Sequence, residues 1–541
     1  MINKLKRFGS LLVLSLLFMG CITSAKTSSY QVNISPISFG LLQARNGEER
    51  YDVLLKTHRT AIEKGVGVDY SGISTIDITI PKNAQSIPLG SVNDFNNVVF
   101  NVENKNQDGF LFKLINDAHY IDISGSLIDK GFFSSIPQLK SGTKLLIIED
   151  KKPWVERRRG YVYGHTRRDI LLLKGGKALN SVIMPYDNRN SVPTCKFYSP
   201  KYKSVLFQNI TLKRKQSSTA KTYLCDITGF NNVQLNNVTI NTPLSDMVED
   251  MAIHISECTN VDFNGVVING TYSKLNHSGY GISMNNIWNY TATNLNGIGN
   301  WGIFGCNNIN KAYIENSIIN RFDIHCYGRD VKYKNVIFNK LYNQYSSVFG
   351  TIIYEQCTFN DFIPVLYESS YNAYSNHNVI ISNCTINLTK DHNYIIRAGL
   401  LSNQRNQRHE LSVKYWPHLK INNLTVNVPS GVSEMFVYYV VQDVSDSTNL
   451  IDAINSIEIK GLDCKYKSNY QVPINLKISN ISVNSPNEVR VVMERVNLLS
   501  PELDKNTAQD VLEWFGGKVS VNINENTKRK TVILNKSKIN N

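Results

Sequence analysis

The middle of the chain is a series of short segments in which apolar and polar residues alternate, each introduced by an amide side chain and followed by a polar turn. Such alternation predicts β-strands with one buried face. Asparagine tolerates the left-handed turn conformation and can hydrogen-bond to its counterparts in neighbouring repeats. Examples are Asn209-Ile-Thr-Leu, Asn237-Val-Thr-Ile, Asn335-Val-Ile-Phe and Asn383-Cys-Thr-Ile. Many of these segments begin about 19 to 30 residues apart, which is typical of stacked repeats. The pattern predicts an all-β fold, a parallel β-helix in which each coil stacks on the last.

The region before the repeats has a different period. Apolar residues between Glu49 and Gly65 recur at helical spacing, and the glycine marks the end of a helix. A first strand, Ile76-Asp-Ile-Thr-Ile, follows and ends at a proline. A helix that covers the open end of a stack and is followed by such a strand resembles the N-terminal cap of pectin-lyase-like right-handed β-helix proteins. We therefore assign residues 45–490 to one β-helix domain and expect residues 491–541 to be irregular, with a short helix from Asp504 to Phe515.

Residues 1–25 have the pattern of a signal peptide. Basic residues precede the apolar run Leu11–Met19, which is too short to span a bilayer. Gly20-Cys21 follows and resembles the lipobox of bacterial lipoproteins, and cleavage after Ala25 is the alternative. We expect export to the periplasm or surface of a Gram-negative bacterium, with a lipid on Cys21 that anchors the protein to the outer membrane.

Charge then narrows the class of partner. The 541 residues carry a formal net charge of +14, which favours a polyanionic partner. Because the protein is expected outside the cytosol, we predict an acidic polysaccharide and no nucleic acid. The nine cysteines include no C-x-x-C pair, so we expect buried thiols and no zinc site.

The stretch Arg321–Asp330 carries the candidate chemistry. As a strand it places Phe322, Ile324 and Cys326 on an apolar face. The residues expected on the opposite face are Arg321, Asp323, His325, Tyr327 and Arg329.

This polar face has the groups that β-elimination from a uronate requires, namely a base for the C5 proton, an acid for the leaving oxygen and a cation beside the carboxylate. We assign these roles to His325, Tyr327 and Arg329, with the first two interchangeable, and expect Asp323 to orient the histidine. Counting residues back from the repeat asparagines places His254 on the same face. It would lie about three coils away, roughly 14 Å at the strand spacing of ~4.8 Å.

Aromatic and basic residues near this strand are candidates for binding sugar rings and anionic groups. The basic segment 151–169 is expected to form a loop that contacts the glycan, with His165 as a reserve acid–base group. The substrate-binding candidates are Arg157, Arg159, Tyr163, His165, Arg167, Arg168, His277, Tyr280, Trp301, Arg321, Tyr345, Glu368 and Tyr371.

No cofactor is predicted, and no acidic run has the spacing of a calcium loop. In β-helix pectate lyases acidic residues hold calcium, and Asp246, Glu249 and Asp250 are the acids that precede His254. The motifs of the related polygalacturonases are missing, since Asn241-Thr-Pro stands in place of Asn-Thr-Asp. The sequence resembles exported bacterial polysaccharide lyases, including those that cleave chondroitin or dermatan sulfate. The alternatives are a glycoside hydrolase using Asp250, Asp323 or Glu368, and a surface protein that binds glycans without cleaving them.

Overall fold

We analysed a computed structural model of the 541-residue chain. The residues that it describes are 33–155, 165–183, 186, 192–215, 217–218, 220–241, 251–269, 280–298, 302–340, 342–345, 348–368, 376–400, 418–432, 435–442, 456–466, 474–478, 489–498, 511–514, 517–523 and 530–535.

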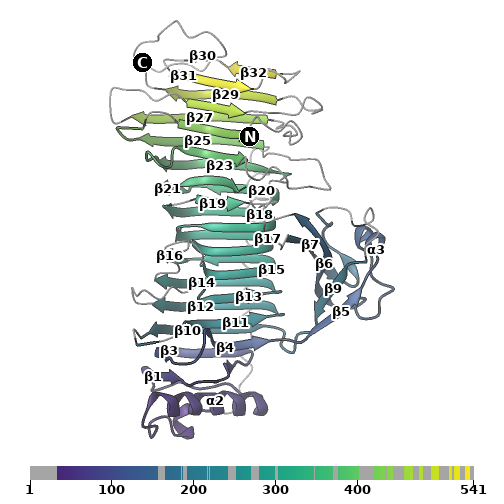
Figure 1. Ribbon diagram of the computed structural model, residues 1–541, viewed down its shortest axis with the longest axis vertical. Helices are drawn as coiled ribbons and strands as arrows, with labels where there is room; N and C mark the ends of the chain where they lie inside the picture. Colours follow the sequence, from purple (N-terminus) through teal and green to yellow (C-terminus); the bar gives the residue numbers. More distant parts are fainter. Residues whose placement is uncertain are drawn as a thin grey trace, which may run out of the picture.

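Most of the described chain is one stack of parallel strands (Figure 1). Each strand pairs with the strand one coil further along the chain, and in the large sheet every pairing between described strands is parallel except β30–β31. One column of the stack contains β1 (Thr75–Ile80), β3 (Val92–Asn104), β10 (Val205–Arg214), β12 (Asn231–Asn241), β14 (Thr259–Asn269), β15 (Tyr280–Thr293), β17 (Gly302–Ile319), β18 (Phe322–Asn339), β20 (Val348–Glu355), β23 (Asn376–Asn387), β25 (His418–Val428) and β27 (Ser456–Tyr466).

A second column faces a different direction and shares the long strands β15, β17 and β18 with the first. Its other members are β2 (Ile87–Pro88), β4 (Gly109–Ile115), β11 (Thr222–Thr228), β13 (Ile253–Ser256), β19 (Tyr342–Tyr345), β22 (Ile363–Glu368), β24 (Tyr394–Leu400), β26 (Met435–Gln442) and β28 (Ile474–Ile478). Short strands β16 (Asn296–Ile298) and β21 (Thr358–Asn360) complete some coils. A continuous core of isoleucine, valine, leucine and phenylalanine fills the stack.

The asparagines that introduce the repeats turn the chain as predicted. Asn237 has a φ of 51° and Asn335 also has a φ of 51°. The side-chain amide of Asn237 donates to Asn209 Oδ1 at 3.1 Å, and that of Asn335 donates to Asn316 Oδ1 at 2.7 Å. These ladders fix the register of successive coils, because a shift by one residue would break them all.

The predicted helix is present as α2 (Gly47–Lys64), which lies at the β1 end of the stack (Figure 1). Asn46 begins it by accepting a hydrogen bond from the Glu49 backbone, and Gly65 ends it with a φ of 66°. Leu54 on its buried face belongs to the same core as Ile78 of β1. The helix thus covers apolar side chains that the first coil would otherwise expose.

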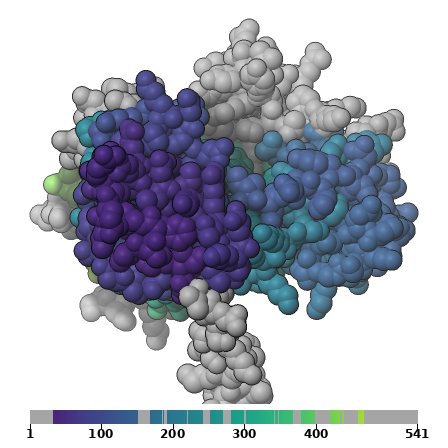
Figure 2. Space-filling view, turned by 90° about the horizontal axis from the view of Figure 1, so that it is seen from below, coloured from purple at the N-terminus to yellow at the C-terminus, as the bar shows by residue number. Residues whose placement is uncertain are grey.

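A five-stranded antiparallel sheet interrupts the stack between β4 and β10, which the sequence did not predict. It consists of β5 (Ala118–Asp122), β6 (Thr143–Val155), β7 (His165–Lys174), β8 (Lys177–Ala178) and β9 (Thr194–Tyr198), with helix α3 (Gly125–Lys130). Its apolar core is separate from that of the stack. Figure 2 shows this insert in blue as a lobe beside the stack. The segment expected to be a loop is therefore in part the β6–β7 hairpin.

The C-terminal region also differs from the expectation of an irregular segment. Strands β29 (Val489–Leu498), β31 (Gly517–Ile523) and β32 (Lys530–Asn535) continue the parallel pairing of the stack. The end of the predicted 504–515 helix is instead strand β30 (Val511–Trp514), which pairs with β31. Alternation of apolar residues in these strands carries the repeat pattern past residue 490.

Candidate functional site

A row of outward-facing residues crosses the second column of the stack. Successive pairings align His254, Ser283, Gly305, Asp323 and Gln344, one from each coil. His254 and Asp323 are therefore three coils apart, the separation that the sequence predicted for His254 and His325. His325 follows Asp323 by two residues, so it lies beside this row.

Asp323 is fully buried and forms an ion pair with Arg321, which is also fully buried. The Arg321 Nε donates to the carboxylate at 2.6 Å, its Nη2 donates to Gln344 Oε1 at 2.6 Å, and the Gln344 backbone donates to Asp323 at 3.2 Å. Burial has the largest single effect on the pKa of Asp323 and raises it. The charge and the hydrogen bond of Arg321, together with the imidazole of His325 nearby, outweigh that effect and hold the pKa below its ordinary value of 3.8. Asp323 is thus an anion at neutral pH.

Tyr280, the first residue of β15, links Asp323 to His325 through its hydroxyl group. Its hydroxyl lies 2.7 Å from Asp323 Oδ2 and 2.7 Å from His325 Nε2. Since Asp323 is an anion it can only accept, so the hydroxyl proton of Tyr280 points to the carboxylate. The tyrosine oxygen then accepts from His325, which places a proton on Nε2. In the neutral imidazole, Nδ1 is consequently the nitrogen that can accept a proton.

Two glycines in β17 allow this contact between coils that are not adjacent. The Tyr280 ring lies across Gly302 and Gly305, and a Cβ on Gly305 would come within 2.6 Å of the Tyr280 Cγ. The same ring packs against the imidazole of His325 at 5.3 Å between centroids. A side chain at position 305 would separate the tyrosine from Asp323 and His325.

His325 stands at a break in the strand register. Ile324 pairs with Cys306, but Cys326 pairs with Asn307, so His325 is the additional residue of a β-bulge. The bulge leaves the imidazole 16% exposed beside the fully buried Asp323. Phe322 and Ile324 point into the core, as predicted. The side chain of Cys326 lies outside the described part of the chain.

The structure contradicts the roles assigned to Tyr327 and Arg329. Tyr327 is buried and has a φ of 64°, and it occupies the corner that Asn308 holds in the preceding coil, with a φ of 56°. The chain changes direction there, so neither residue shares the face of His325. Arg329 lies beyond the corner and donates to the carbonyl of Ser181 in the insert at 3.3 Å. The bulge is the reason that simple alternation fails after His325.

Tyr345 is not a sugar-binding residue either. It pairs with Ile324 on the core side of the strand and is fully buried, and its hydroxyl bonds to those of Tyr333 and Tyr354 at 3.0 and 2.8 Å. Arg168 lies on β7 of the insert, where its Nε is 3.3 Å from Glu149. The predicted site residues that lie outside the described part are Arg157, Arg159, Tyr163, His277, Trp301, Tyr371 and Asp250, and the side chains of His165, Arg167 and Glu368.

His254 occupies the other end of the row in a less polar setting. Burial lowers its pKa, an effect that the charges of Asp226 and Glu257 partly oppose. Its ring packs against Phe110 at 6.2 Å, and its Nδ1 has no hydrogen-bond partner among the described residues. Among the described residues, His254 therefore has no counterpart of the Tyr280 hydroxyl or of the Arg321–Asp323 ion pair, the two features that orient His325.

The insert is fastened to the stack at the corner that precedes β14. Glu257, with a φ of 59°, takes the position of a corner asparagine. Its carboxylate accepts from Lys196 at 2.8 Å and from the hydroxyl of Tyr198, both on β9. Trp288 of β15 joins apolar residues of the insert in a shared cluster. These contacts hold the insert against the strands that carry Tyr280 and His325.

Within the described ranges, no three His, Cys, Asp or Glu side chains lie close enough together to hold a metal ion. The helices of these ranges include none with the length and apolar character needed to cross a membrane. The cysteines whose side chains are described are all buried.

Comparison with known proteins does not assign a family. No family model and no curated protein matches the chain. Three similar solved structures are tailspikes: that of Acinetobacter baumannii bacteriophage AP22 in complex with A. baumannii capsular saccharide, that of Pseudomonas phage phi297 and that of Pseudomonas phage LKA1. Their identities are 12, 11 and 14%, and their TM-scores are 0.46, 0.49 and 0.47. The matches cover 85, 87 and 86% of this chain and 79, 81 and 82% of the respective tailspikes. Likeness at this level assigns neither family nor function.

Proposed function

We propose that the protein is a polysaccharide lyase that cleaves an anionic, uronate-containing glycan by β-elimination, with His325 as its catalytic residue. The observation that carries this proposal is the hydroxyl of Tyr280, 2.7 Å from both Asp323 Oδ2 and His325 Nε2. This arrangement fixes the tautomer and the orientation of a partly exposed imidazole. A general base needs both properties.

The elimination needs one group that carries a proton, and His325 is that group. Nδ1 of His325 takes the proton from C5 of the uronate, and the electron pair of that C–H bond forms the C4–C5 double bond. The C4–O bond breaks, and its electrons go to the glycosidic oxygen, which receives the same proton from His325. The imidazole returns to its neutral state, and no other reactant is needed. Tyr280 and Asp323 are positioning residues that hold the imidazole in one orientation through both transfers.

Of the three carboxylates considered for hydrolysis, Asp323 is the one whose side chain the structure describes, and its position argues against that role. Glycoside hydrolases generally use two carboxyl groups on opposite sides of the bond that is cleaved. Asp323 is buried and paired with Arg321, and Tyr280 covers it, so it cannot reach a sugar. Arg321 has no exposed surface and cannot neutralise the substrate carboxylate. That cation must come from another basic residue of this positively charged chain.

We also propose where the protein is located and which hand the stack of strands has. An N-terminal signal peptide and lipidation of Cys21 would place the enzyme in the periplasm or on the cell surface, where polysaccharides are found. The stack is proposed to be a right-handed parallel β-helix, the hand that parallel crossovers adopt almost without exception.

One assay separates the three candidate activities. The purified protein is incubated with chondroitin, dermatan, heparan, pectin and alginate, and both ultraviolet absorbance and new reducing ends are measured. A lyase produces an unsaturated uronate that absorbs, together with reducing ends, from at least one of them. Reducing ends without the absorbance would show a hydrolase. Binding without either signal would show a glycan-binding protein.

A further inference from the structure

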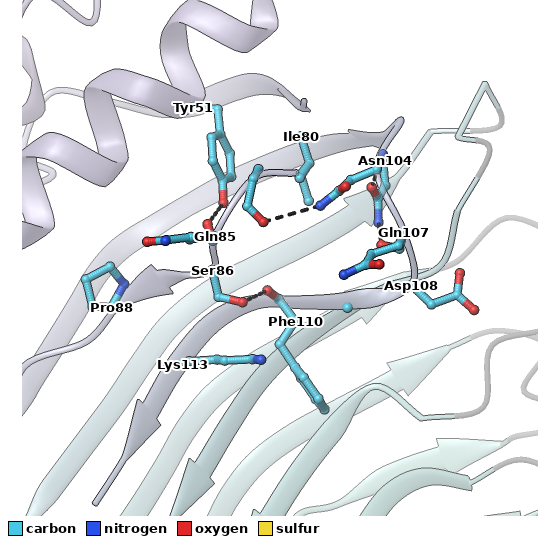
Figure 3. A pocket seen from close by; sticks show the side chains of 13 residues that line it. Tyr51, Ile80, Gln85, Ser86, Pro88, Asn104, Gln107, Asp108, Phe110 and Lys113 are labelled. Carbon is cyan, nitrogen blue, oxygen red and sulfur yellow. Dashed lines mark hydrogen bonds between the residues drawn. The ribbon is translucent and has the colours of Figure 1, made fainter. Parts of the chain in front are cut away.

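A pocket of about 390 Å³ lies at the N-terminal end of the stack, apart from His325 (Figure 3). One wall is the segment from Ala84 to Pro88, beneath helix α2, and the other is the turn from Asn104 to Phe110. The hydrogen bond from the Ser86 hydroxyl to the Phe110 carbonyl, at 2.6 Å, ties the two walls together. The pocket is therefore built into the first coils.

The pocket combines an aromatic face with an unpaired cation. Lys113 Nζ lies 5.8 Å from the centre of the Phe110 ring. Lys113 is an exposed side chain whose register neighbour in the next coil is Asp226, and it forms no ion pair with a carboxylate among the described residues. A half-buried ring offers a surface for the apolar face of a sugar, and a free ammonium group offers a partner for an anion. The two together suit a sugar that carries a carboxylate or a sulfate.

The polar lining includes one carboxylate, Asp108, which is paired with Lys221: it accepts from the Lys221 backbone at 2.8 Å and lies 3.8 Å from Lys221 Nζ. Gln107 lines the pocket with an exposed side chain, and its amide can donate to or accept from hydroxyl groups. Asn104, by contrast, is occupied by the carbonyls of Gln107 and Lys221 at 3.2 and 2.7 Å. One amide therefore shapes the turn while another remains available to a ligand.

The pocket lies on the same row as the candidate site. Lys113 pairs with Asp226, which pairs with His254, and from there the row runs through Ser283 and Gly305 to Asp323. Five steps of ~4.8 Å separate Lys113 from Asp323, or about 24 Å. The centroid of the Phe110 ring lies 6.2 Å from that of His254, so a wall of the pocket contacts a member of this row. A glycan of several sugar units can reach both places.

We infer that this pocket is a distal subsite, in which Phe110, Gln107 and Lys113 bind one anionic sugar of the glycan chain that is cleaved at His325. The inference rests on the proposed function. The contribution of this pocket to glycan binding depends on the length of the glycan, because a short oligosaccharide held at His325 does not extend to Lys113. An extended contact of this kind would favour long polysaccharides over short fragments.

The test measures binding without turnover. Labelled disaccharides and octasaccharides of oligogalacturonate and of chondroitin sulfate are titrated into the His325→Ala protein, alone and with Lys113→Met. The matched control is Lys105→Met, which removes the same charge nearby from a lysine that is 3.7 Å from Glu103. Circular dichroism and melting temperature verify that each variant is folded.

We expect Lys113→Met to weaken octasaccharide binding about tenfold, a factor that corresponds to ~1.4 kcal/mol, while disaccharide binding and the control stay unchanged. Equal octasaccharide affinity with and without Lys113→Met would overturn the subsite and leave the proposed function standing. Equal loss for both lengths would also overturn it, because Lys113 would then not be distal. If the His325→Ala protein binds none of the four probes, both the subsite and the uronate substrate are overturned.

Discussion

The hydroxyl of Tyr280 lies 2.7 Å from Nε2 of His325, although the two residues belong to strands separated by β17. The tyrosine spans that strand because Gly302 and Gly305 leave room for its ring. Its position between Asp323 and His325 is the feature on which the proposed chemistry depends.

Replacing Gly305 with alanine tests the space beneath the tyrosine. The new methyl group would overlap the Tyr280 ring and displace it from His325. We expect turnover to fall about a hundredfold, as a misplacement of ~1 Å in a catalytic group can cause, with little change in melting temperature. Gly90→Ala is the matched control, since a Cβ there meets no atom within 4 Å. Wild-type turnover in Gly305→Ala would contradict this role of Tyr280.

The buried ion pair makes Asp323 important for stability. Asp323→Asn leaves the guanidinium of Arg321 buried without its counter-ion, which costs about 3–5 kcal/mol. Glu355→Gln removes one partner of a surface pair, 2.8 Å from Lys332, and should cost about 1 kcal/mol or less. Urea unfolding of the two variants measures both values. Equal losses would show that burial adds nothing to the Arg321–Asp323 pair.

The same pair predicts the effect of acid. The pKa of Asp323 in the folded protein lies below its ordinary value of 3.8, so its stabilising contribution is fully present above that value. It is lost as the pH falls through the lowered pKa, because protonation then removes the charge that Arg321 faces. In the wild type, the free energy of unfolding in urea should fall as the pH drops below about 4. We expect this fall to be smaller in Asp323→Asn. Parallel pH profiles for the two proteins in that range would exclude Asp323 as the source.

Glu257 should fasten the insert without stabilising the stack. Glu257→Asn keeps a residue that tolerates the left-handed corner, as Asn286 and Asn308 do, but removes the acceptor of Lys196 and Tyr198. We expect faster proteolysis within residues 118–198 and an unchanged melting temperature of the stack. Lys196→Met should act in the same direction. Unchanged proteolysis in both variants would place the anchor elsewhere, with Trp288 as the next candidate.

Much of the stack could be predicted from local patterns. Short segments reveal the backbone preferences of residues and the period of apolar and polar positions. These two signals were enough to predict the corner asparagines, the alternation of Phe322 with Asp323 and the buried cysteines. Helix α2 likewise has its beginning and end in the sequence, at Asn46 and Gly65.

The parts that could not be predicted depend on contacts between coils. A single additional residue at His325 reverses the expected faces, so Tyr327 becomes a buried corner residue. The partner of the histidine is instead Tyr280, which comes from two strands earlier in the stack. The two outward glycines at 302 and 305 are the one local signal of that contact. The insert was missed because an antiparallel sheet between two coils has no counterpart in the repeat pattern.

Whether Tyr280 positions His325 for catalysis is tested by comparing Tyr280→Phe with Tyr327→Phe in the unsaturated-uronate assay, on whichever polysaccharide the wild type cleaves. Each variant loses one hydroxyl group, and only the hydroxyl of Tyr280 lies between Asp323 and His325. We expect Tyr280→Phe to lower kcat about a hundredfold or more and to alter its pH profile, while Tyr327→Phe stays within about threefold of wild type. Loss of activity in Tyr327→Phe with full activity in Tyr280→Phe would contradict this expectation.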